Sequence, residues 1–234
     1  MHPNRPRAAN PELEAAMARL KLTFLLTLLF LALPAFPADP APPLSREQAR
    51  QSLSGADVQV RRQAAIRLGE IGLMGDTPAL RQALRDADAD TREHAENALW
   101  RIWERSGDQQ IDRLYRTGIE QMKGGELQQA IATFTRVIQL KPEFAEGWNK
   151  RATLYFVAGE YAKSLADCAQ VIKRNPYHFG ALAGYGQIYL KLEEYAHARD
   201  YFQRALEANP NMDSVRLNIL LLERLIEQKR RNMV

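Results

Sequence analysis

Side chains that could perform catalysis or bind a metal are few and scattered along the sequence. The four histidines, His2, His94, His178 and His197, do not pair at the spacing that puts two metal ligands on one helical turn. The sequence lacks the Gly-x-Ser-x-Gly nucleophile turn, the Walker A phosphate loop and the zinc-binding His-Glu-x-x-His. Its one cysteine, Cys168, excludes an intrachain disulfide, and we interpret it as a small buried side chain. We therefore expect no catalytic residue, metal or cofactor, and a protein that works by binding.

The elements that would present a binding surface repeat along the second half of the chain. Pro142, Pro176 and Pro210 are spaced by 34 residues, and each ends a helical pattern because proline cannot continue a helix. Small residues recur where two antiparallel helices must come close, and large ones recur where they fill the space between neighbours. The matched sets are Leu114, Trp148 and Leu182; Gly118, Ala152 and Gly186; Ala130, Ser164 and Ala198; Phe134, Cys168 and Phe202; Val137, Val171 and Ala205.

This pattern resembles the tetratricopeptide repeat (TPR) over residues 109–210, in units 108–142, 143–176 and 177–210. Cys168 departs from it, because an aromatic residue is usual at that position. The resemblance implies two helices per unit, with the first helix of each lining a concave groove. The residues it places there are Asp112, Tyr115, Ile119 and Met122; Glu146, Asn149, Thr153 and Phe156; Gly180, Ala183, Gln187 and Leu190.

The predicted groove is apolar along one edge and polar beside it, which suits an extended peptide or a helix. Some eukaryotic TPR proteins bind a C-terminal carboxylate with Lys, Asn and Arg at five set positions. The corresponding residues here are Tyr115, Ile119, Lys150, Gly180 and Gly184, and among these Lys150 alone is positively charged. We therefore do not predict that carboxylate clamp, but we count Lys150 among the residues expected to bind a peptide in the groove. The alternative is a groove that is simply solvated, or filled by the protein's own linker.

A shorter repeat lies upstream, where residues 53–61 align with residues 84–92 at an offset of 31. Asp57 and Asp88 are suitable helix N-caps in the two copies. The pattern resembles a pair of HEAT-like repeats over residues 45–107. Certain HEAT-like proteins are bilin lyases, but this sequence reproduces no catalytic set of theirs.

Trp100 and Trp103 stand where the first copy of the upstream repeat has Gly69 and Gly72. Glycine lets helices approach, whereas tryptophan fills a gap and is usually buried. We predict that the two tryptophans form the joint between the upstream repeats and the TPR units. The alternative is that one of them is a partly exposed surface residue.

The last segment, residues 212–234, is predicted to be a capping helix with a basic tail. Apolar residues cover a wide arc of residues 212–230, more than a simple cap needs. The helix packs on the preceding repeat alone, or it also meets a second copy or a partner helix. Leu221, Leu222 and Leu225 are the candidate residues for that homo-oligomer or partner face.

The N-terminal residues 1–38 have the layout of a secretory signal. Arg19 and Lys21 precede the uncharged run from Leu22 to Leu33, and small residues and prolines follow it. The whole uncharged stretch from Leu22 to Ala38 has 17 residues and contains two prolines. It is short for a bilayer span of about 20 residues, so we favour cleavage over a permanent membrane anchor through residues 20–38. Met17 is the better candidate for the true start. Residues 39–44 form a proline-rich linker.

Net charge is +4, and the positive groups are spread rather than gathered in a stripe, so nucleic acid is not an expected partner. The sequence predicts an all-α, right-handed solenoid: HEAT-like helical pairs, three TPR units and a capping helix. We expect an exported, non-catalytic adaptor of the bacterial periplasm that binds a protein or peptide in the TPR groove. The alternatives are an inner-membrane-anchored assembly factor with the same groove, and an enzyme subunit or bilin-lyase-like protein acting through the HEAT-like part.

Overall fold

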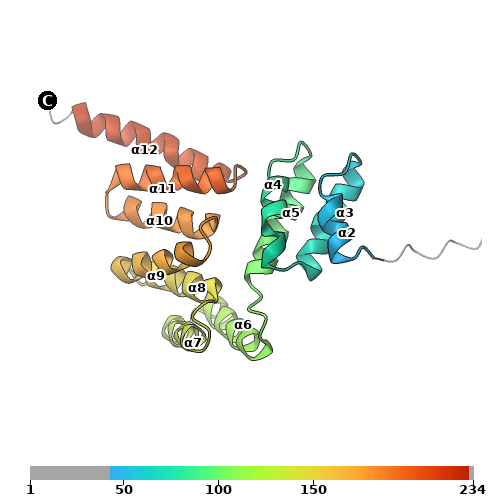
Figure 1. Cartoon of the computed structure of the whole chain (residues 1–234). Coiled ribbons are helices and arrows are strands. Elements are labelled where there is room, and N and C mark those ends of the chain that lie inside the picture. The colour runs from blue at the N-terminus through green and yellow to red at the C-terminus, as the bar shows by residue number, and fades with distance from the viewer. Residues whose placement is uncertain (1–42, 232–234) are drawn as a thin grey trace, which may run out of the picture. The chain divides into compact units, whose positions relative to one another are not determined.

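The structure is a computed structural model that describes residues 43–231. The predicted signal or anchor in residues 1–38, the predicted start at Met17 and residues 39–42 of the linker lie outside the described residues, as do residues 232–234 of the basic tail. All regular structure in the described part is helical (Figure 1). The helices are α2 (Arg46–Ser52), α3 (Val58–Ile71), the short 3-10 helix η1 (Met74–Asp76), α4 (Thr77–Ala83), α5 (Ala89–Trp103), α6 (Gln109–Lys123), α7 (Leu127–Leu140), α8 (Ala145–Val157), α9 (Tyr161–Arg174), α10 (Phe179–Lys191), α11 (Tyr195–Ala208) and α12 (Asp213–Arg231).

The second half of the chain consists of three packed helix pairs, α6 with α7, α8 with α9, and α10 with α11, and α12 packs on α11 (Figure 1). Asp108 caps α6 by accepting hydrogen bonds from the backbone N–H groups of Gln110 and Ile111. Gly125 and Gly159 each turn the chain between paired helices with φ at +75°, a conformation that costs glycine nothing. The prediction of an all-α solenoid is confirmed.

The first half consists of α2 to α5, which we call the N-terminal array. Ser45 and Gln48 form a capping box at the start of α2, and the Asp57 side chain caps α3. The 31-residue repeat is visible in the hydrogen bonds. Arg61 donates to the carbonyls of residues 55 and 56, and Arg92 donates in the same way to those of residues 86 and 87.

The same two arginines show how the N-terminal array continues into the TPR units. Arg61 forms a two-pronged ion pair with Asp86, which lies in the second copy, at 2.7 and 2.9 Å. Arg92, its equivalent, donates instead to Asn211 Oδ1 at 3.0 Å, and Asn211 Nδ2 donates to the carbonyl of Leu84. Asn211, in the loop before α12, therefore takes the place that Asp86 has between the first two copies.

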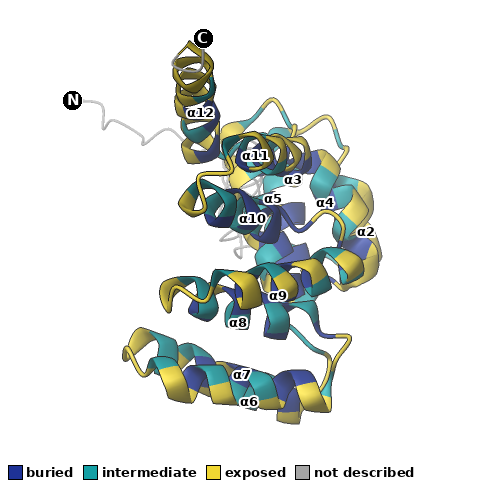
Figure 2. Cartoon of the chain, turned by 90° about the vertical axis from the view of Figure 1, so that its left-hand side faces the viewer, coloured by how far each residue is buried: buried dark blue, intermediate teal, exposed yellow. Residues whose placement is uncertain are grey.

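One buried cluster contains residues of α2–α5 and of α10, α11 and α12. Figure 2 marks the buried positions along these helices in dark blue. The fully buried members of the cluster include Leu68, Leu99, Phe202 and Leu222. Smaller clusters fill the first unit around Phe134 and the layer between the second and third units. The N-terminal array and the third TPR unit thus share one hydrophobic core, which fixes the array against the helices that carry the predicted groove.

Candidate functional site

A pocket of about 140 Å³ opens between α8 and α10, on the side that carries the predicted groove residues. We call this side of α6, α8 and α10 the groove face. Five of the predicted groove residues line the pocket: Asn149, Thr153, Phe156, Gly180 and Gln187. The walls are completed by Ala152, Ser164, Cys168, Ala181, Gly184 and Ile188.

The pocket exists because the second unit lacks a large aromatic residue in α9. In the first unit, the buried ring of Phe134 lies so close to Gly118 that a Cβ there would meet Cζ at 2.6 Å. The third unit repeats this pair with Phe202 and Gly186. The second unit has Ala152 and Cys168 instead, and both line the pocket. The departure from the TPR pattern at Cys168 was the sequence signal for this pocket.

The pocket has an apolar floor and a polar rim. Burial and the neighbouring Asp167 raise the pKa of the Cys168 thiol to about 12, so it stays uncharged and behaves as an apolar wall. On the rim, Thr153 is exposed and donates to the backbone carbonyl of Asn149, while Phe156 and Gln187 are half-buried. An apolar hollow with a few polar groups at its edge is the usual form of a binding site.

Three predicted groove residues are engaged by the protein itself and are not free to bind a peptide. Tyr115 is buried against Phe134 and Phe144 and donates its hydroxyl to Glu104. Burial and the nearby carboxylates raise its pKa far above the usual range, so it remains a donor. Asn149 is 9% exposed and donates to Glu146, so it forms part of the pocket wall. The expectation of a freely accessible polar edge is therefore corrected at these positions.

Lys150, the third of these residues, is held by two carboxylates. Its Nζ lies 3.2 Å from Glu104 and 3.6 Å from Glu146.

Three more predicted groove residues lie apart from the pocket and pack as partly buried members of neighbouring clusters. Ile119 and Met122 belong to the cluster of the first unit, and Leu190 packs against the large shared cluster.

Trp100 and Trp103 lie against the start of α10. Trp103 is buried and stacks on His178 with 4.5 Å between ring centroids. Trp100 meets Phe179 edge to face at 5.1 Å, and a Cβ on Gly180 would lie 2.5 Å from its Cη2. These contacts join the N-terminal array to the third TPR unit. The effect of removing either tryptophan stays a prediction.

A buried ionic cluster beneath these tryptophans was missed by the sequence reasoning. His178 Nδ1 accepts a hydrogen bond from the N–H of Ala181 at the start of α10, and its Nε2 lies 2.6 Å from Glu146 Oε1, both side chains being fully buried. Burial alone raises the pKa of Glu146, but His178, Lys150 and Asn149 outweigh it and hold this pKa at about 2. Glu146 is therefore a buried anion that ties α8 to α10. Glu146 and His178 are 32 residues apart, two short of the 34-residue period, so the repeat pattern did not pair them.

The predicted partner face of α12 needs one correction. Leu222 is 1% exposed and belongs to the shared core, because it points toward α11 together with Val215 and Ile219. Leu221 and Leu225 are exposed, as are Leu217 and Leu220. The apolar face that α12 leaves uncovered is therefore Leu217, Leu220, Leu221 and Leu225.

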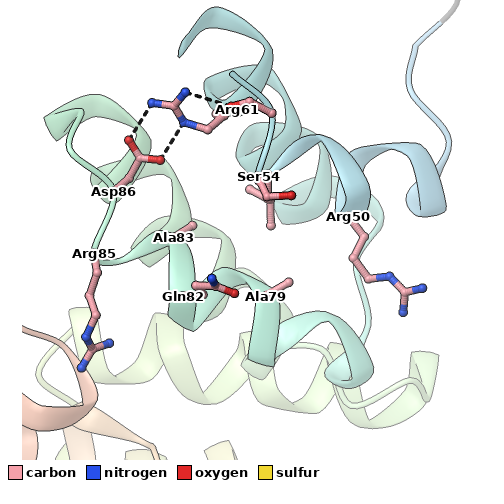
Figure 3. Close-up of a pocket in the computed structure, with 10 residues that line it drawn as sticks. Arg50, Ser54, Arg61, Ala79, Gln82, Ala83, Arg85 and Asp86 are labelled. Atoms are coloured by element: carbon pink, nitrogen blue, oxygen red, sulfur yellow. Dashed lines mark hydrogen bonds and ion pairs between the residues drawn. The ribbon is translucent and has the colours of Figure 1, made fainter. Parts of the chain in front are cut away.

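A second pocket, of about 630 Å³, lies between α2 and α4 of the N-terminal array (Figure 3). Arg61 crosses its edge, where its guanidinium is already bound to Asp86 and to two backbone carbonyls. Arg85 points away to the carbonyl of Glu207. Both of these arginines are thus engaged in contacts within the protein.

Among residues 43–231, no group of three or more His, Cys, Asp or Glu side chains is placed to hold a metal ion. Within the same range, none of the helices is both long and apolar enough to span a bilayer.

Comparison with known proteins identifies the repeats. Residues 115–178 and 151–213 match the tetratricopeptide repeat family model. A TPR repeat-containing protein of Rhizobium etli is 36% identical over 107 residues, which are 46% of this chain and 52% of that protein. Anaphase-promoting complex subunit 3 of Schizosaccharomyces pombe is 36% identical over 86 residues, 37% of this chain and 13% of that protein. The chain therefore spans about half or less of these relatives.

Solved structures show the same fold. The first TPR domain of Spaghetti (RPAP3), bound to the HSP90 peptide SRMEEVD, has a TM-score of 0.50 at 22% identity, covering 51% of this chain and 96% of its own. The TPR domain of Sgt2 from Aspergillus fumigatus has a TM-score of 0.50 at 22% identity, covering 53% and 83%. The chain is an all-α helical-repeat protein, and residues 115–213 are made of tetratricopeptide repeats.

Proposed function

We propose that this protein is a non-catalytic adaptor that binds a segment of another protein on its groove face. The observation that carries the proposal is the pocket between α8 and α10, with its apolar floor and polar rim. The wider support is the TPR match, since the Spaghetti domain is a TPR domain with a bound peptide.

The size of the pocket indicates what it holds. A volume of about 140 Å³ is close to the roughly 150 Å³ of an apolar cavity that accepts a benzene molecule. One leucine, methionine or phenylalanine side chain of a partner therefore fits, while Thr153 and Gln187 on the rim are placed to bond the partner's backbone. We propose a partner segment with one large apolar anchor residue.

The test fills the pocket without disturbing the fold. Cys168→Phe alone would bring a ring against Ala152, whereas Ala152→Gly/Cys168→Phe recreates the pair found in the other two units. Peptides are selected from a random display library on the wild-type protein, and their affinities are measured for the wild type, the double variant and Ala162→Leu. Ala162 is an exposed α9 residue outside the pocket lining and serves as the control for added bulk.

We expect the selected peptides to share an apolar anchor and to lose at least tenfold in affinity for the double variant, while Ala162→Leu leaves binding unchanged. Equal binding by a folded double variant would refute the pocket as the site. Thermal melts followed by circular dichroism establish that both variants are folded.

We also propose that the protein is exported, on the strength of the signal-like layout of residues 1–38. N-terminal sequencing of the protein from fractionated cells tests this. A mature chain that begins after Ala35 or Ala38 in the soluble exported fraction supports cleavage. An intact N-terminus in the membrane fraction supports the anchored alternative instead.

A further inference from the structure

The last turn of α5 lies on the groove face and contacts the first helix of every TPR unit. Glu104, the residue that follows α5, accepts hydrogen bonds from Tyr115 of α6 and Lys150 of α8, each at 3.2 Å. Trp100, one turn earlier, reaches the start of α10 at Gly180. The protein's own chain thus occupies the half of the groove face that contains Tyr115, Lys150 and Gly180.

The fit at α10 is too close to be incidental. A Cβ on residue 180 would lie 2.5 Å from Trp100, so α5 can approach only because this residue is glycine. Beside it, Trp103 is 5% exposed and belongs to the core shared by the N-terminal array and the third unit. Because that core is continuous, the last turn of α5 stays on the groove face while the protein is folded.

The donors on this half of the groove face are already used. Lys150 is 18% exposed and lies between Glu104 and the fully buried Glu146. The Tyr115 hydroxyl donates to the same oxygen of Glu104. A lysine shared by two carboxylates offers a third one little, because its charge is already balanced.

We propose that residues 100–104 act as an internal ligand of the groove face, which occupies the donors that a peptide's C-terminal carboxylate would need. The partner is then an internal segment of another protein, bound through its apolar anchor and not through its free C-terminus. This choice of partner class rests on the proposed function of the α8–α10 pocket. The occupation of Tyr115 and Lys150 by Glu104 does not.

The experiment uses the peptide SRMEEVD, labelled at its N-terminus, in two forms: with a free C-terminal carboxylate and with an amide cap. Fluorescence polarisation gives the ratio of the two affinities for the full chain, for Glu104→Ala and for Glu104→Gln. Glu93→Ala is the matched control, because it removes the same charge from an exposed position on α5. The ratio of the two affinities does not depend on whether the pocket accepts an apolar side chain. Failure of the internal-ligand proposal is therefore distinguishable from failure of the proposed function.

The wild type and Glu93→Ala should not distinguish the two forms, or should bind neither. Glu104→Ala should prefer the free carboxylate at least fivefold, and adding Lys150→Met should abolish that preference. Glu104→Gln, which can keep both hydrogen bonds, is the variant to use if Glu104→Ala does not fold, and it should prefer the carboxylate at least twofold. A tenfold carboxylate preference in the wild type would overturn the proposal. So would the lack of any preference in both folded Glu104 variants.

Discussion

The repeat packing makes a sharp prediction at Gly186, where a single methyl group should destabilise the protein. A Cβ at this position would lie 2.4 Å from Cδ1 and 2.5 Å from Cε1 of Phe202. Phe202 is fully buried, so its ring cannot swing into solvent to make room. Gly184, two residues away on the same helix, provides the contrast, because a Cβ there meets only the Cys168 sulfur at 3.7 Å, an ordinary contact.

The magnitude follows from two opposing terms. Replacing glycine by alanine inside a helix favours folding by about 1 kcal/mol. Overpacking a core typically costs about 1–3 kcal/mol, and the contacts at Phe202 place this case at the upper end. Gly186→Ala should therefore lower the free energy of unfolding by about 1–2 kcal/mol, or the melting temperature by roughly 2–8 °C for a chain of this size.

Urea unfolding followed by circular dichroism measures the difference. Gly184→Ala should be neutral or should stabilise the protein by up to about 1 kcal/mol, since it gains helix propensity without a clash. Phe202→Leu, which is destabilising by itself, should remove most of the additional loss caused by Gly186→Ala. If Gly186→Ala is as stable as Gly184→Ala, the reasoning about close helix crossing in this repeat is wrong.

Three further predictions concern the joint, the buried anion and α12. Trp103→Ala should lower the free energy of unfolding by about 3–5 kcal/mol, and Trp100→Ala should lower it by less. Urea unfolding that shows no loss of stability in either variant would contradict the structural role of the two tryptophans as a joint. Because the pKa of Glu146 is held at about 2 against an ordinary 4.5, its contribution to stability is complete above pH 4.5 and is lost as the pH falls toward 2, so Glu146→Gln should flatten that part of the acid unfolding curve relative to the wild type. Leu221→Glu should leave unfolding within about 0.5 kcal/mol but abolish any self-association through residues 212–230 seen by light scattering, whereas Leu222→Glu should unfold the protein, and the reverse order would contradict the burial of Leu222.

The TPR fold was predictable because its signal is repeated. The prolines and the small–large pairs recur at one period, so each unit supports the reading of the others. The caps of α2 and α3 were also predictable, since Ser45, Gln48 and Asp57 act on neighbours within three residues. Helical periodicity placed Leu222 within a wide apolar arc, but it could not say which part of that arc α11 covers.

The occupied half of the groove was beyond sequence reasoning for a physical reason. Glu104 bonds to Lys150 across 46 residues, and Arg92 to Asn211 across 119. No period or spacing links such pairs, because they depend on how the N-terminal array docks on the TPR units. The pocket between α8 and α10 was partly predictable from the sequence. Cys168 marked a missing aromatic ring, yet its consequence appears only when Gly184 of the next unit is placed beside it.

Amide chemical-shift mapping shows whether another protein's apolar anchor residue binds between α8 and α10. Isotope-labelled protein is titrated with a library-selected peptide, and the shifted resonances are assigned. We expect the largest changes on Thr153, Phe156, Gly184 and Gln187. Changes confined to α12 or to the pocket between α2 and α4 would contradict this expectation.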